Sequence, residues 1–154
     1  MATSQDIASF DRQTRALIYD EFMQTGLPPS SMQAAVSLSC SQAAVGESFG
    51  RLAAGRVIVL QPENGEILMA NPFSAVPTPF LVASGGQIYF GNCIWDALGI
   101  PAMLRQDAVI QSSCADCGLA IRLHVTGGEL QELSAGIAHF AVPARQWWEN
   151  IVFT

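Results

Sequence analysis

Basic residues are scarce in this chain of 154 residues, in which seven Lys and Arg stand against 13 Asp and Glu and the formal net charge is -6. A protein that binds nucleic acid without sequence preference needs basic surface to meet the phosphates. The charge balance therefore argues against that class and permits a neutral small molecule or a partner helix as the ligand. Hydrophobic residues make up 50% of the chain, which excludes a disordered protein and predicts one globular domain or two small lobes sharing a core.

Long apolar runs are also absent. No stretch reaches the roughly 18 consecutive apolar residues that a membrane span requires. Residues 1–11 hold no basic region followed by an apolar stretch, so we expect no secretory signal. A cytoplasmic protein is therefore expected, in which the four cysteines are free thiols, metal ligands or catalytic groups rather than disulfides.

Several familiar catalytic motifs are missing as well. The chain has no Gly-rich, Lys-bearing phosphate loop and no dinucleotide fingerprint between a strand and a helix. It has no serine nucleophile elbow. Chemistry must therefore be sought in its cysteines and the residues beside them.

The first seventy residues show the element order of a winged helix. Apolar spacing and capping residues predict three helices, at residues 11–24, at residues 31–38 with Ser31 as the cap, and from a Ser39 or Ser41 cap to about residue 54. Strands at residues 57–60 and 67–70 flank Asn64-Gly65, a strong hairpin signal. A winged helix can bind DNA or serve as a structural lobe. The third helix offers only Arg51 to phosphates, so the structural lobe is favoured and nucleic acid is not an expected partner.

Pro72, Pro77 and Pro79 predict an extended linker that divides the chain. The expected parts are a winged-helix-like lobe at residues 1–71, a linker at 72–79 and a second unit at 80–154. In that unit the predicted strands are residues 80–83, 88–90, 109–112, 119–125 and 137–142, with Gly127-Gly128 as a turn. Residues 93–98 predict a helical turn or two ended by Gly99 and Pro101, and residues 144–150 a terminal helix. The predicted fold class is α+β, with a small mixed sheet and short helices beside the first lobe.

The densest chemical signal is Cys93 with Asp96. In a helix these residues stand on one face, and a helix start favours a thiolate over a thiol. A thiolate is a soft-metal ligand, and a nearby carboxyl group can deliver or relay a proton. The alternative is a buried structural cysteine beside a capping or exposed aspartate. The spacing alone favours this alternative.

Cys114 and Cys117 form a second signal, because two cysteines at this spacing can hold a metal or form a redox pair. Structural zinc needs four ligands, and His124 and His139 would have to complete the set. A tight turn whose thiols line a pocket or the core is the favoured interpretation. The two histidines are expected to be ordinary sheet residues, Cys40 to be structural, and Trp147 and Trp148 to close the core.

Residues 89–104 (YFGNCIWDALGIPAML) resemble the central motif of the organomercurial (alkylmercury) lyase family, in which a Cys is followed three residues later by an Asp and then by a Pro-Ala pair. Residues 112–118 (SSCADCG) and the winged-helix-like first lobe are similar to that family too. The resemblance implies that Cys93 binds mercury and Asp96 protonates the departing carbon, giving a hydrocarbon and Hg(II). No cofactor is then required, mercury is substrate and product, and small cellular thiols accept the product.

The resemblance also implies further thiol roles. The family's second metal-binding Cys is expected about where this chain ends, so either the chain is shortened or another thiol serves, and Cys117 is the substitute. The implied metal ligands are thus Cys93, Asp96 and Cys117, and Cys114 matches a structural cysteine of the family. Three hypotheses follow, in order: a carbon–mercury lyase whose turnover depends on the second thiol, a non-catalytic thiol or metal-binding member of the family, and a winged-helix regulator.

Overall fold

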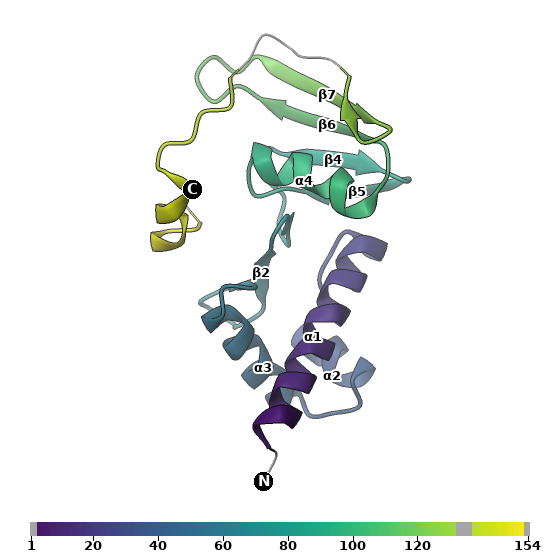
Figure 1. The fold of residues 1–154 in the computed structure, drawn as a ribbon, viewed down its shortest axis with the longest axis vertical. Helices are drawn as coiled ribbons and strands as arrows, with labels where there is room; N and C mark the ends of the chain where they lie inside the picture. Colours follow the sequence, from purple (N-terminus) through teal and green to yellow (C-terminus); the bar gives the residue numbers. More distant parts are fainter. Residues whose placement is uncertain (1–2, 132–136, 153–154) are drawn as a thin grey trace.

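Three helices form one end of the molecule and a five-stranded sheet forms the other, with a three-stranded sheet between them (Figure 1). The computed structural model describes residues 3–131 and 137–152. The helices are α1 (Ser4–Thr25), α2 (Ser31–Ser37), α3 (Gln42–Ala54), α4 (Ile94–Leu104) and the 3-10 helix η1 (Ala144–Glu149). The strands are β1 (Val59–Leu60), β2 (Ile67–Ala70), β3 (Phe73–Ser74), β4 (Leu81–Ser84), β5 (Gln87–Phe90), β6 (Ala108–Ser113), β7 (Ala120–Thr126) and β8 (Glu129–Leu130).

Capping residues set the ends of the first helices. Ser30, and not the predicted Ser31, caps α2 by accepting a hydrogen bond from the Gln33 N–H. Ser31 instead binds the hairpin, because its N–H and its hydroxyl both donate to the Glu66 carboxylate, at 2.8 and 2.6 Å. Of the two caps predicted for α3, Ser41 is the one observed. Helix and hairpin are therefore joined by a carboxylate at a helix start, where the backbone N–H groups lack partners.

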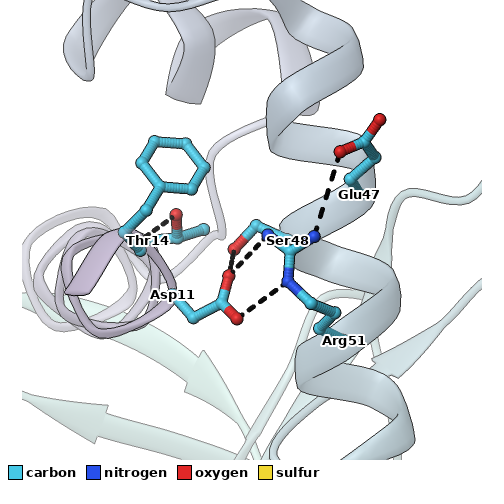
Figure 2. A network of polar contacts seen from close by, with 6 residues as sticks. Asp11, Thr14, Glu47, Ser48 and Arg51 are labelled. Atoms are coloured by element: carbon cyan, nitrogen blue, oxygen red, sulfur yellow. Dashed lines mark hydrogen bonds and ion pairs between the residues drawn. The ribbon is translucent and has the colours of Figure 1, made fainter. Parts of the chain in front are cut away.

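A polar network fastens α1 to α3 (Figure 2). The Asp11 carboxylate accepts hydrogen bonds from the Arg51 guanidinium at 2.9 and 2.8 Å and from the buried Ser48 hydroxyl at 2.6 Å. Glu47 adds a looser ion pair to Arg51 at 3.9 Å. The single basic residue of α3 is thus paired with two acids at the surface, which leaves its charge less available to DNA phosphates.

The segment predicted as a linker contains a strand and part of the core. β3 pairs with β2, which makes a three-stranded antiparallel sheet with the predicted hairpin of β1 and β2. The Phe73 ring stacks on Phe22 of α1 at 5.1 Å between centroids and lies 5.7 Å from the Tyr89 ring of β5. Buried residues before and after this segment form one hydrophobic cluster. The division of the chain into a lobe at residues 1–71, a linker at 72–79 and a second unit at 80–154 therefore stays a prediction.

The five-stranded sheet has the order β5-β4-β6-β7-β8, and every strand pair in it is antiparallel. The α+β class is confirmed, while the expected mixed sheet is corrected to an antiparallel one. The strand predicted at residues 137–142 is wrong, because these residues form no regular secondary structure. β7 instead turns at residues 127–128 directly into β8, which takes the neighbouring position in the sheet.

α4 is longer than predicted, because it runs through Gly99 and Pro101 to Leu104. A proline inside a helix costs about 3 kcal/mol or more through the lost hydrogen bond and steric conflict. Here Ile100 and Pro101 are buried, and burial of apolar surface offsets that cost. Within residues 3–131 and 137–152, no helix combines the length and the apolar character needed to cross a bilayer.

Candidate functional site

The site begins where β5 passes into α4. Gly91 permits this passage, because a Cβ on it would lie 2.6 Å from the Ala97 backbone nitrogen. The Thr78 hydroxyl donates to the Gly91 carbonyl at 2.6 Å and anchors the same point. Cys93 then occupies the N-cap position of α4 in an extended conformation, and its side chain makes no capping hydrogen bond. The thiol faces the Asp96 side chain on the first turn of the helix.

Cys93 and Asp96 are in contact, as the spacing predicted. The Cys93 Sγ donates a hydrogen bond to the Asp96 Oδ2 at 3.6 Å. Both side chains are partly buried. The geometry places a transferable proton between a soft-metal ligand and a carboxylate, which are the two groups that protonation of a metal-bound carbon needs.

Burial changes the titration of both groups. Desolvation raises the pKa of the Cys93 thiol, an effect that the backbone N–H groups of Asp96 and Trp95 reduce and the Asp96 charge increases. The expectation of a thiolate favoured by the helix start is thus corrected, because burial outweighs the helix N–H groups. Desolvation also raises the pKa of Asp96, against hydrogen bonds from Asn92 and Cys93 that lower it. In the free site the proton accordingly stays on sulfur, and the carboxyl group accepts a proton more readily than an exposed aspartate does.

Asn92 is a site residue that the sequence reasoning missed. Its Nδ2 donates to the Asn71 Oδ1 at 3.1 Å and to the Phe73 carbonyl at 3.4 Å. Its buried Oδ1 has no hydrogen-bond partner among residues 3–131 and 137–152. Asn71 is fixed in turn, because its carbonyl accepts a hydrogen bond from the Tyr19 hydroxyl at 3.1 Å. The only sequence signal for Asn92 is its position next to Cys93.

Two adjoining cavities meet at Cys93. The smaller one, about 50 Å³, is lined by Cys93, Asp96 and five further residues, which are Met69, Asn71, Asn92, Trp147 and Ile151. The larger one, about 330 Å³, shares Cys93 with this cavity and is also lined by residues 139–141 and 151–152 of the C-terminal segment. An apolar group could therefore occupy the larger cavity while an atom bound to the sulfur faces the carboxylate.

The C-terminal segment covers this site. It descends from the sheet along the side of the molecule towards β2 (Figure 1). The Trp147 ring packs 5.2 Å from the Phe140 ring, and its Nε1 donates to the Val142 carbonyl at 3.1 Å. Trp147 was expected to close the core, but it is half-buried and lines both cavities. His139, expected on a strand, is exposed in this segment and lines the larger cavity.

The other cysteines lie away from the two cavities. Cys40 packs against the core at the helical end. Cys114 and Cys117 lie in the turn between β6 and β7, and neither lines a cavity with Cys93. Hydrogen bonds from the backbone N–H groups of Cys117 and Asp116, and then from the Cys117 side chain, lower the pKa of the Cys114 thiol. A shared metal between Cys117 and Cys93 stays a prediction.

A closed zinc site finds no support in the described part of the chain. Among residues 3–131 and 137–152, no three His, Cys, Asp or Glu side chains cluster as metal ligands. His124 lies within β7, paired with Val109, and not in the turn that holds Cys114. Among the described residues the site at Cys93 is thus a thiol and a carboxyl group that form no cluster with a third side chain of these types, although His139 lines the larger cavity.

Comparison with known proteins identifies the fold and the family of the chain. A crystal structure of the mercury-bound form of MerB2 superposes with a TM-score of 0.62 at 20% sequence identity, covering 84% of this chain and 67% of that chain. At that identity the likeness shows the fold. No curated protein sequence matches the chain. The family model for alkylmercury lyase matches residues 73–154, more than half of the chain, including β3 to β8, α4 and the Cys93–Asp96 pair. The chain therefore belongs to the alkylmercury lyase family.

Proposed function

We propose that this chain cleaves the carbon–mercury bond of organomercurials by protonolysis, with Cys93 as the mercury ligand and Asp96 as the proton donor. The observation that carries the proposal is the 3.6 Å hydrogen bond from the Cys93 Sγ to the Asp96 Oδ2 at the wall of a cavity. Membership of the family supports the reaction class. Mercury is the substrate and product, and the chemistry calls for no organic cofactor.

The first step loads the substrate onto Cys93. The sulfur displaces a ligand X from R–Hg–X, an S–Hg bond forms, and the thiol proton passes to Asp96, which already accepts its hydrogen bond. A soft metal draws a thiol into its thiolate form, so the raised pKa of Cys93 does not prevent loading. The raised pKa of Asp96 favours the receipt of this proton.

The second step breaks the carbon–mercury bond. Asp96 gives the proton to the carbon, and the electron pair of the C–Hg bond becomes the new C–H bond. Mercury remains Hg(II), bound to the Cys93 sulfur and facing the carboxylate, so nothing is oxidised or reduced. The partial burial of Asp96 raises the pKa of its carboxyl group and so favours the protonated form that this step needs.

Product release needs acceptors from outside the chain. Two small thiols of a reducing cytoplasm would take Hg(II) as a bis-thiolate; one of their two protons would return to Cys93 and the other would pass to solvent. The larger cavity beside Cys93 is lined in part by the exposed residues His139 and Val152. A small thiol can therefore approach the mercury without opening the core.

Hydrocarbon release from phenylmercury or methylmercury with excess small thiol tests the proposal. We expect the unmodified chain to release benzene or methane, and Cys93→Ala to fall to the rate of the thiol alone. Asp96→Asn should keep one bound mercury per chain and lose at least a hundredfold in release rate, because removal of a general acid costs roughly that factor. Cys40→Ala is the matched control and should match the unmodified chain.

Two results separate the alternatives. Stoichiometric mercury binding at Cys93 without hydrocarbon release by the unmodified chain would make it a non-catalytic thiol and metal-binding member of the family. If Cys93→Ala released hydrocarbon at the original rate, Cys93 would be neither the mercury ligand of a lyase nor that of a non-catalytic binding protein. A winged-helix regulator is the weakest candidate, because Arg51 of α3 is already paired with Asp11.

A further inference from the structure

The turn between β6 and β7 carries two thiols that the proposed mechanism does not use. The Cys114 N–H donates to the Leu119 carbonyl at 2.8 Å, and the Gly118 N–H donates to the Cys114 carbonyl at 2.9 Å. Gly118 has a φ of 71°, a conformation that side-chain-bearing residues rarely adopt. The backbone of this turn is therefore fixed by its own hydrogen bonds and by its glycine, and it holds Cys114 and Cys117 in one arrangement.

In that arrangement the two cysteines stand three residues apart in one turn. Hydrogen bonds from the backbone N–H groups of Cys117 and Asp116, and then from the Cys117 side chain, lower the pKa of the Cys114 thiol. Successive N–H groups directed at one atom form a concave site that stabilises negative charge. A metal ion that replaced the two thiol protons would thus meet two cysteines carried by one hydrogen-bonded turn, with backbone donors that favour the thiolate form of Cys114.

The number of ligands selects the metal. Cys117 is exposed and Cys114 half-exposed, so an ion can reach them from solvent. No third His, Cys, Asp or Glu of the described residues completes a cluster with them, whereas structural zinc requires four ligands. Hg(II) is a soft ion that two thiolates satisfy in a linear complex. It is also the product expected from the reaction at Cys93.

We propose that Cys114 and Cys117 form a second mercury site, which holds Hg(II) as a bis-thiolate independently of Cys93 and Asp96. Binding forms two S–Hg bonds and releases the two thiol protons, and mercury stays in the same oxidation state. The site binds inorganic Hg(II) whether or not the chain cleaves carbon–mercury bonds. Its test therefore does not depend on the outcome of the hydrocarbon assay.

Titration of the full chain with mercuric chloride tests this site. Cys93→Ser serves as the background, the cysteines are fully reduced, and a hundredfold excess of a monothiol competes for the metal. Charge-transfer absorption of the mercury thiolate and the metal retained after gel filtration are measured. We expect Cys93→Ser to retain one Hg(II) per chain, and a further Cys117→Ser change to weaken retention at least tenfold. The control Cys93→Ser with Cys40→Ser should retain as much as Cys93→Ser.

The Cys117→Ser change should not disturb the fold, because the side chain of Cys117 is exposed. Circular dichroism of each variant verifies that the fold is retained. Equal retention by Cys93→Ser and by its Cys117→Ser derivative would overturn the proposal. So would a reduced chain that forms a Cys114–Cys117 disulfide on air exposure but retains no Hg(II) against the monothiol, since the turn would then be a redox pair. A loss of retention on Cys40→Ser would place the mercury elsewhere and contradict the site equally.

Discussion

The guanidinium carbon of Arg56 lies 5.8 Å from the centre of the Trp148 ring. Arg56 follows α3, and Trp148 belongs to η1, so this contact joins the helical end of the molecule to the C-terminal segment. The neighbouring Trp147 and Ile151 line the small cavity beside Cys93 and Asp96. One cation–π contact thus helps to hold the cover of the site in place.

Removal of this contact should expose Cys93. A cation–π contact is worth about 0.5–1 kcal/mol at exposed sites, so Arg56→Gln should raise the population of the uncovered state about two- to fivefold. We expect a bulky maleimide to modify Cys93 faster by that factor, as measured by mass spectrometry of the peptide that contains Cys93. Arg145→Gln is the control. It removes one positive charge from η1 and should leave the rate of Cys93 modification unchanged. Equal rates for both variants and the unmodified chain would contradict the role of Arg56.

Asp96→Asn should lower the pKa of Cys93. Burial is the largest cause of the raised pKa of this thiol and persists in the variant, while the negative charge of Asp96 and its hydrogen bond to the thiol also raise it. The asparagine removes the charge, so the thiolate forms at lower pH. The rate of Cys93 alkylation by iodoacetamide, followed over pH by peptide mass spectrometry, should show a midpoint below that of the unmodified chain. A midpoint that moves up would show that Asp96 stabilises the thiolate instead.

Asp11 should stabilise the fold at neutral pH and lose that effect in acid. Hydrogen bonds from Arg51 are the main cause that lowers the pKa of Asp11 in the folded protein. The stabilisation is therefore present above the ordinary aspartate pKa and disappears as the pH falls through the lowered value. We expect Asp11→Asn to reduce the free energy of unfolding at pH 7 by about 1 kcal/mol.

Urea unfolding at a series of pH values measures this effect of Asp11. The difference between Asp11→Asn and the unmodified chain should shrink steadily towards low pH. Asp20→Asn changes an exposed carboxylate on the same helix and should have little effect. A difference that stays constant with pH would mean that Asp11 acts through packing and not through its charge.

Phe73 should couple the two ends of the molecule. Its ring lies between Phe22 of α1 and Tyr89 of β5, and it is 1% exposed. Truncation of a buried phenylalanine costs about 3–5 kcal/mol. We expect Phe73→Ala to lower the stability of the whole chain in one cooperative transition, with the same midpoint by far-ultraviolet circular dichroism and by tryptophan fluorescence.

The two spectroscopic probes also test the boundaries proposed at residues 71 and 80. Two separate transitions, of which only one moved on Phe73→Ala, would indicate lobes that unfold independently. Phe80→Ala, at a half-buried position just beyond the same segment, provides the comparison and should cost less.

The sequence by itself determined the features that depend on neighbours in the chain. The hairpin at Asn64-Gly65 follows from its turn residues, and the Glu66 N–H bonds to the Asn64 side chain at 2.8 Å. The contact of Cys93 with Asp96 follows from a spacing of three at a helix start. Such features need only local backbone geometry, which a few residues fix between them.

Tertiary packing decided the rest. α4 passes through Pro101 because Ile100 beside it is buried, a gain that local propensity does not include. Residues 137–142 were predicted as a strand but form no part of the sheet. Within them, Phe140 packs against Trp147, which lines the cavities at Cys93. The pKa of Cys93 is raised and not lowered, because burial by distant segments outweighs the helix start. Desolvation and apolar contact depend on which remote residues meet, and only the folded chain brings those residues together.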